Sequence, residues 1–299
     1  MPNTIIKYLL ILVSLLLAHQ SSLAQSFMGW QYNDRYFSFN VGTGKVGYAG
    51  DLSHGRVFQK GLASASFGVE ARLLKKISAR VEARWYNISG SDARAEDDEF
   101  SLQRNLNFRS SNIELDISGM YYFLNSYQGM YYKRKAIDPY ISLGVGLTFF
   151  NPKTDLNGTT YALRDYNTEG RSYGGSAFIV PLGIGAKLSL NEFINLIPEF
   201  SYRIVFSDYL DDVSGTFGGP YSEPIPAALS NRKDEVGVIN QEFYDRMVPG
   251  AQRGDALSQD KYYMITIKLE AYLPPDLFKS KGAKYSKQKL YKKPSAFDK

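Results

Sequence analysis

The sequence has no cysteine and only two histidines among its 299 residues. Without cysteine there is no disulfide framework, no zinc–thiolate site and no thiol nucleophile. One histidine lies within the first 24 residues, which leaves His54 alone in the remainder and excludes a histidine-rich metal site. After residue 24 there is also no run of 18 apolar residues. A transmembrane helix needs about 20, so none is predicted.

The first 24 residues have the features of a secretory signal. Lys7 supplies a positive charge, residues 8–18 are apolar except for Ser14, and Ser22-Leu23-Ala24 is a plausible cleavage site. The apolar run is too short for a membrane anchor, and no cysteine follows for lipid attachment. We therefore predict an exported protein that is stabilised by a large core, a metal or a bilayer.

A two-residue period dominates the rest of the chain. Between residues 140 and 149, Ile, Leu, Val and Phe alternate with Tyr, Ser, Gly and Thr. This alternation fits a β-strand, because successive side chains point to opposite faces. Eight segments share the pattern: residues 37–42, 64–71, 77–85, 112–123, 140–149, 178–189, 195–204 and 263–271. Aromatic residues make up 14% of the chain, 23 of them Tyr, which favours an outer-membrane barrel.

The polar face of these strands carries six acids and six bases. They are Glu70, Arg72, Arg80, Glu82, Arg84, Glu114, Asp116, Lys187, Glu199, Arg203, Lys268 and Glu270. Mixed charges suit the lumen of an eight-stranded barrel, which side chains can just fill and where buried charges must be paired. We predict that the polar face points inward, forms ion pairs and leaves no pore. The alternative is a soluble lipocalin-like barrel with an apolar pocket, in which the apolar face would point inward and the polar face outward.

The connections alternate between short and long. Tight turns are expected at residues 74–76 and 191–193, a longer one at 124–136, and long loops at 44–61, 89–109, 151–176 and 207–260. With the N-terminus in the periplasm, the long loops face the exterior. The fourth long loop holds ten acids and four bases.

The segment at residues 274–299 holds eight lysines and two aspartates, and forms a basic tail on the periplasmic side. Aromatic residues interleaved with the lysines predict docking on an acidic periplasmic partner. An unordered arm is the alternative. The predicted docking residues are Lys279, Lys281, Lys284, Tyr285, Lys287 and Tyr291.

Three motifs suggest chemistry, and each has a structural alternative. Residues 42–47 spell GxGxxG, but a loop rather than a helix is expected next, so no dinucleotide site is predicted. Asp51, Ser53 and His54 would suit a rim hydrolase, or simply a solvated turn. Asp208, Asp211 and Asp212 are metal candidates for Ca²⁺, or a structural capping cluster.

Several short stretches occur in a recognisable order between about residues 36 and 273. They read GYAGDL at 47–52, RNLNFR at 104–109, DPY at 138–140, FFNP at 149–152, TEG at 168–170, PLGIG at 181–185, DYLDDVSG at 208–215, ALSNR at 228–232 and RG at 253–254. This series resembles the PorG-type outer-membrane barrels associated with type IX secretion. The resemblance implies a barrel that works with periplasmic ring proteins of that apparatus, without catalysis or cofactor. Unlike an ordinary barrel, this chain continues for 26 residues beyond Leu273.

The predicted fold class is all-β, an eight-stranded antiparallel up-and-down transmembrane β-barrel in the bacterial outer membrane. Its parts are a signal peptide (1–24), the barrel (25–273) and the basic tail (274–299). The predicted function is a non-enzymatic component of type IX secretion that docks the periplasmic ring proteins to the membrane. The alternatives are a structural or adhesive barrel acting through the acidic fourth loop, and a rim enzyme using His54.

Overall fold

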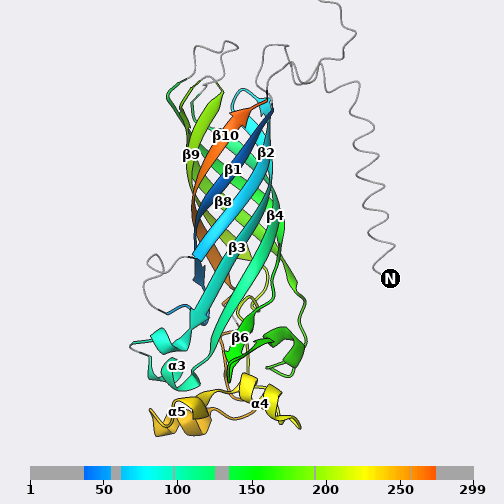
Figure 1. Cartoon of the computed structure of the whole chain (residues 1–299), viewed down its shortest axis with the longest axis vertical. Helices are drawn as coiled ribbons and strands as arrows, with labels where there is room; N and C mark the ends of the chain where they lie inside the picture. Colours follow the sequence, from blue (N-terminus) through cyan, green and yellow to red (C-terminus); the bar gives the residue numbers. More distant parts are fainter. Residues whose placement is uncertain are drawn as a thin grey trace, which may run out of the picture.

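The computed structural model describes residues 37–54, 62–96, 98–124, 135–191, 193–256 and 258–273. The expected signal peptide and the basic tail with its docking residues lie outside these ranges. Eight of the strands in the described residues form one barrel (Figure 1). They are β1 (Phe37–Ala49), β2 (Leu62–Leu74), β3 (Ile77–Ser91), β4 (Asn107–Tyr122), β5 (Ile137–Phe149), β8 (Ser176–Ser189), β9 (Ile194–Val205) and β10 (Lys261–Tyr272).

The barrel is closed by the pairing of its first and last strands. Each of the eight strands pairs antiparallel with its neighbours along the chain, and β1 pairs with β10 from Ser38↔Tyr272 to Ala49↔Lys261. Closure leaves no unpaired edge, as a bilayer requires. The predicted eight-stranded antiparallel barrel is confirmed.

The outward face of the barrel is an exposed apolar belt. The alternate residues Val81, Ile117, Leu143, Ile184 and Ile267 are 57%, 53%, 59%, 57% and 57% exposed, while the charged residues between them are buried. A soluble barrel would leave this surface in water, so the lipocalin-like alternative is wrong. The belt is the surface that meets lipid.

The first long connection begins at residue 50, six residues later than the predicted loop at 44–61. β1 runs through the GxGxxG segment to Ala49, because its backbone pairs in full register with β10. Its glycines avoid clashes within the sheet. A Cβ at Gly44 would lie 2.1 Å from the carbonyl oxygen of Ile265, and one at Gly47 would lie 2.2 Å from the Tyr263 ring.

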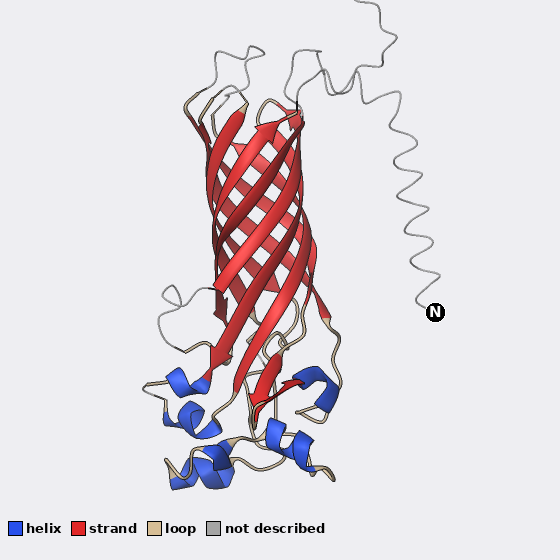
Figure 2. Ribbon diagram, in the orientation of Figure 1, coloured by secondary structure: helices blue, strands red, loops and turns tan. Residues whose placement is uncertain are grey.

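The four long connections gather at one end of the barrel and fold there (Figure 2). We call their described residues the cap: 50–54, 92–106 without 97, 150–175 and 206–260 without 257. The cap contains β6 (Lys153–Leu156), β7 (Thr159–Ala162), α3 (Glu99–Arg104), α4 (Pro224–Ser230), α5 (Gln241–Arg246) and the short 3₁₀ turns η1 (Asp92–Arg94), η2 (Leu163–Tyr166) and η3 (Lys233–Glu235).

Local sequence explains two of these elements. Asn157 and Gly158 have φ values of 51° and 80°, which suits the two-residue turn between β6 and β7. Asp98 accepts hydrogen bonds from the Phe100 and Ser101 amides at the start of α3, and Asn105 ends the helix at φ 56°. Among the described residues, no helix is long and apolar enough to span a membrane.

Candidate functional site: a filled lumen and a folded cap

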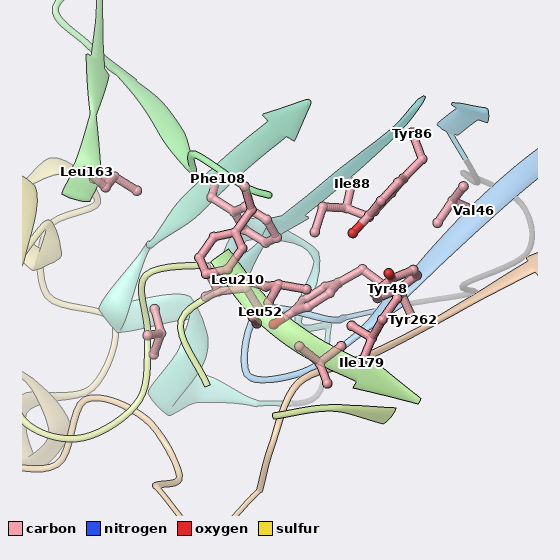
Figure 3. Packing of buried hydrophobic residues seen from close by; sticks show 14 of the residues in the cluster. Val46, Tyr48, Leu52, Tyr86, Ile88, Phe108, Leu163, Ile179, Leu210 and Tyr262 are labelled. Carbon is pink, nitrogen blue, oxygen red and sulfur yellow. The ribbon is translucent and has the colours of Figure 1, made fainter. Parts of the chain in front are cut away.

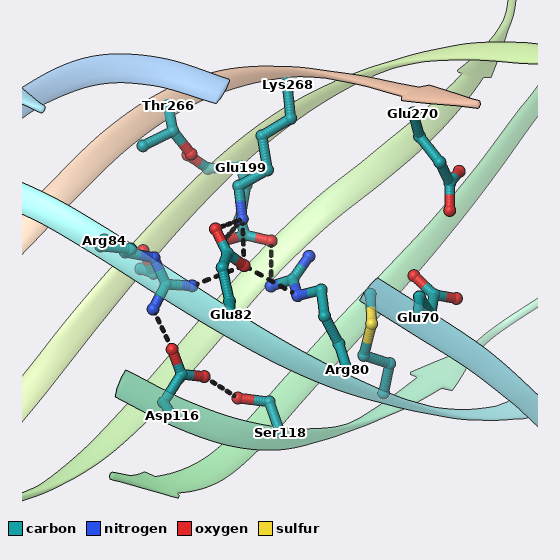
Figure 4. Close-up of polar contacts among 12 residues, drawn as sticks. Glu70, Arg80, Glu82, Arg84, Asp116, Ser118, Glu199, Thr266, Lys268 and Glu270 are labelled. Carbon is teal, nitrogen blue, oxygen red and sulfur yellow. Dashed lines mark hydrogen bonds and ion pairs between the residues drawn. The ribbon is translucent and has the colours of Figure 1, made fainter. Parts of the chain in front are cut away.

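The centre of the lumen holds a network of buried charges on the inward faces of the strands (Figure 4). Glu82, on β3, contacts three cations: Arg80 Nε at 3.0 Å, Arg84 Nη2 at 2.7 Å and Lys268 Nζ at 2.8 Å. Glu199, on β9, contacts Arg80 Nη2 at 2.7 Å and Lys268 Nζ at 2.9 Å. Each of these side chains is 2% exposed or less, apart from Arg84 at 3%.

The network continues toward β4. Arg84 also pairs with Glu114 and Asp116, and Arg203 Nη2 lies 3.2 Å from Glu114 Oε1. Tyr262 donates its hydroxyl hydrogen to Glu114 Oε2 over 2.5 Å. The complete network has four acids, Glu82, Glu114, Asp116 and Glu199, and four bases, Arg80, Arg84, Arg203 and Lys268. Charge is therefore balanced inside the barrel.

A second balanced group lies nearer the short turns. Lys187 Nζ is 2.9 Å from Glu70 and 2.6 Å from Glu270, and Arg72 lies 4.0 Å over the ring of Tyr122. The Tyr122 hydroxyl donates to Glu70 over 2.7 Å. Eleven of the twelve polar-face charges named from the sequence thus form buried ion pairs. The twelfth, Arg72, is buried against the Tyr122 ring and completes the balance of charge.

Apolar residues also fill the lumen. Met120, Tyr122, Tyr140 and Ile197 form a small buried cluster that contacts both charge groups, since Tyr140 donates to Glu199 and Tyr122 donates to Glu70. Toward the cap the inward positions of the strands change from charged to apolar, as at Tyr86, Ile88, Val46, Ile179 and Tyr262 (Figure 3). A barrel filled in this way is not built as a channel.

The larger apolar cluster joins the barrel to the cap. Tyr86 and Tyr262 stack with ring centroids 4.8 Å apart, and cap residues Leu52 and Leu210 belong to the same cluster. The sequence analysis missed this core. A signal for it was present in the sequence, since Tyr262 and Met264 replace the polar residues expected on the inward face at the start of β10.

Two buried arginines hold the cap loops together. Arg253 Nη1 lies 3.0 Å from Glu169 and its Nη2 lies 3.3 Å from Asp212, which ties the fourth long loop to the third. Arg104 Nε is 2.8 Å from Asp92, and its guanidinium also bonds to the backbone carbonyl groups of Arg253 and Asp51. The cap is therefore an ordered part of the molecule.

The residues of the suggested rim hydrolase do not form a catalytic triad. His54 Nε2 lies 3.0 Å from Asp92, a residue that sequence analysis did not single out. The Ser53 hydroxyl bonds to the backbone of Gly50, and Asp51 accepts from the Asp255 amide. Asp92 also pairs with Arg104, so its contacts with His54 and Arg104 connect loops of the cap.

Two of the three aspartates proposed for Ca²⁺, Asp211 and Asp212, have separate partners. Asp211 accepts from Tyr48 and from the Val213 amide, whereas Asp212 accepts from Thr168 and Tyr173 and pairs with Arg253. Within the described ranges, no group of three or more acidic or histidine side chains could hold a metal ion. Their geometry is that of a structural cluster.

A tyrosine hydroxyl bridges two aspartates at the base of the cap. The Tyr48 hydroxyl oxygen lies 2.6 Å from Asp211 Oδ2 and 2.6 Å from Asp260 Oδ1. A hydroxyl has a single hydrogen to donate, so one of these carboxyl groups must carry a proton. Burial, followed by the nearby charge of Asp260, raises the pKa of Asp211 well above its usual range. Burial also raises the pKa of Asp260 to about 7 and that of Asp208 to about 8.

We expect the cap to lose stability as the pH rises. An acid with a raised folded-state pKa stabilises the fold fully below its unfolded pKa, and this contribution is lost as the pH passes the folded value. For Asp260 and Asp208 the window runs from about 4 to about 7 and 8. Near-UV circular dichroism during urea unfolding of the cap, measured between pH 5 and 8.5, should show this fall.

The variant Asp211→Asn is the matched control, because an amide supplies a hydrogen at every pH. It should reduce the pH dependence of cap unfolding between pH 5 and 8.5, while the part that comes from Asp260 and Asp208 remains. The same slope in the variant and in the unchanged chain would show that Asp211 does not contribute to it.

Closure of the strands, the exposed apolar belt and the lumen of paired charges define the class of this protein. It is a transmembrane β-barrel of the bacterial outer-membrane type, with a folded cap on its long-loop end. The expected location in the outer membrane follows from the same features.

Several solved outer-membrane proteins are similar to this chain at low sequence identity. The Neisserial surface protein A (NspA) is 9% identical and has a TM-score of 0.40, covering 79% of this chain and 97% of that one. The outer membrane protein OprG from Pseudomonas aeruginosa is 14% identical, with a TM-score of 0.43 and coverage of 81% and 99%. The outer membrane enzyme PagL is 9% identical, with a TM-score of 0.31 and coverage of 79% and 99%. No protein-family model and no curated protein matches the sequence.

Proposed function

We propose that this protein is a non-enzymatic anchor in the outer membrane that docks the periplasmic ring proteins of the type IX secretion machinery. The observation that carries the proposal is the filled lumen, which holds two balanced groups of buried charges and two buried apolar clusters. A barrel whose lumen is filled can bind partner proteins at either end, but it does not provide a channel. The resemblance of the ordered sequence motifs to PorG-type barrels supplies the particular machinery.

We propose that the ring proteins dock at the end of the barrel that carries the short turns. β1 begins and β10 ends there, so the last described residue, Leu273, lies on the same side, and the basic sequence at 274–299 follows it in the chain. Its eight lysines suit an acidic partner surface at long range, and its aromatic residues suit specific contact.

Deletion of the gene, followed by mass spectrometry of the proteins retained in the cells, tests the secretion role. We expect secreted cargo to accumulate, and expression of the full chain to restore its export. A chain ending at Leu273 should still insert, but should bring down less of the ring proteins and export less cargo. Unchanged export in the deletion strain would refute the secretion role, and full ring association of the truncated chain would refute docking by the tail.

The alternative of an adhesive barrel is favoured by one observation, the ordered cap. A loop of unpaired charges would not need buried arginines such as Arg253 and Arg104 to hold its shape. The export assay separates the alternatives, since an adhesin can be deleted without loss of secretion.

A further inference from the structure

A short apolar turn projects from the outer surface of the cap. Val236, Val238 and Ile239 are 41%, 55% and 46% exposed, and lie between η3 and α5. Gly237 between them has a φ of +70°, a backbone conformation that favours glycine. The rings of Phe100 on α3 and Phe243 on α5 pack against each other with centroids 5.9 Å apart. We call residues 236–239 the apolar turn.

The apolar turn is held in place by one buried side chain. Gln103 on α3 has no exposed surface, and its amide nitrogen donates to the carbonyl oxygen of Gly237 over 2.7 Å. Its amide oxygen accepts from the backbone nitrogen of Ile239 over 2.7 Å. Weaker bonds reach Lys233 and Asn240 at 3.3 Å. A turn fixed in this way loses little conformational entropy on binding.

The membrane does not cover the apolar turn. The belt on β3 ends near Trp85, and the outward residues beyond it, Asn87, Ser89 and Ser91, are polar. Residues 86–91, the last six of β3, span about 20 Å along the strand at a rise of 3.4 Å per residue. Helices α3 and α5 lie farther out still, at the end of the cap (Figure 1). The three aliphatic side chains of the apolar turn are therefore exposed to water beyond the apolar belt, and such a group indicates a contact surface.

The rim of the apolar turn is acidic. Its exposed carboxylates come from α3, η3 and α5, and are Glu99, Asp234, Glu235, Glu242 and Asp245. Glu235 pairs with Arg232, and Glu242 pairs with Arg246. The other three accept hydrogen bonds from neutral side chains, namely Asn240, Tyr244 and Gln241, which leaves their negative charges in place.

We propose that the apolar turn docks into a shallow apolar pocket of an extracellular protein, with lysine or arginine residues around that pocket. An apolar centre with a charged rim is the usual arrangement of a specific interface. The acidic rim repels anionic lipid headgroups and also a second copy of the same surface. The proposal rests on the cap alone and holds whether or not the barrel serves secretion.

Photocrosslinking on intact cells tests this docking site. The photoreactive residue p-benzoylphenylalanine replaces Val238 in one strain, and replaces Ile225 on α4, which is 36% exposed, in the control strain. We expect a protein adduct from position 238 only. Ile239→Asp, introduced beside the photoreactive residue, should reduce its yield about tenfold or more, as loss of a central apolar contact does.

The crosslinked protein is then purified and titrated against the unmodified barrel. Combined Glu99→Gln, Asp234→Asn and Asp245→Asn should weaken binding and reduce its dependence on salt, whereas Glu223→Gln, an exposed acid just before α4, should not. Heat-dependent gel mobility confirms that each variant folds. No adduct, an adduct with lipid or with a second copy, or a protein adduct insensitive to Ile239→Asp and to the rim changes, would overturn the proposal.

Discussion

Replacing Glu82 with alanine is expected to lower the free energy of unfolding of the barrel by about 3–5 kcal/mol, because it leaves buried charges without their partner. Glu82 has no exposed surface and contacts Arg80, Arg84 and Lys268. Once the carboxylate is gone, the cations repel one another in a lumen that water cannot readily enter. Urea unfolding in lipid vesicles, followed by heat-dependent gel mobility, measures the loss.

Two further variants show whether burial is the cause. Arg109 and Asp155 pair at 2.8 Å on the outside of the molecule, with side chains 57% and 50% exposed. Arg109→Ala should therefore cost less than about 1 kcal/mol. Combining Glu82→Ala with Lys268→Met should cost less than the sum of the single changes, since it removes both an acid and a base. Equal losses for Glu82→Ala and Arg109→Ala would contradict a lumen of desolvated ion pairs.

The barrel could be predicted from the sequence because its signal is local. Val81, exposed to lipid, and Glu82, buried in the lumen, are neighbours in the chain, and a period of two assigns them to opposite faces. The choice of ion-pair partners, by contrast, is not determined by the local sequence. Lys187 contacts Glu70 and Glu270, which are 117 and 83 positions away, and only barrel closure brings the three together.

The cap could not be predicted in the same way, because its order comes from contacts between loops. Glu169 and Arg253 are 84 residues apart and belong to different connections. Local signals for the β6–β7 turn at Asn157-Gly158 and for the start of α3 at Asp98 were present in the sequence. Neither signal indicates the surface on which the element packs.

Arg253→Met is expected to release the fourth long loop from the rest of the cap while leaving the barrel intact. The Arg253 side chain pairs with Glu169 and Asp212 and donates to the backbone carbonyl groups of Ser230 and Asp212. Removing it leaves two buried carboxylates facing each other, at a cost of about 3–5 kcal/mol to the cap. Limited proteolysis of the purified protein should then cut between residues 206 and 260 at least tenfold faster, as an opening equilibrium shifted by more than 1.4 kcal/mol requires.

Arg246→Met provides the matched control, because Arg246 lies in the same loop but pairs with Glu242 at 3.5 Å on the surface, where both side chains are more than 60% exposed. Its cleavage rate should stay within about twofold of the unchanged chain, given the small value of an exposed ion pair. Heat-dependent gel mobility should be the same for both variants, since the belt and the central lumen network do not include either arginine. If Arg253→Met instead lowered the unfolding temperature of the barrel and left loop cleavage unchanged, the cap would not be a separately stabilised unit. Faster cleavage with an unaltered barrel would show that the ion pairs of Arg253 hold the surface loops in their binding conformation.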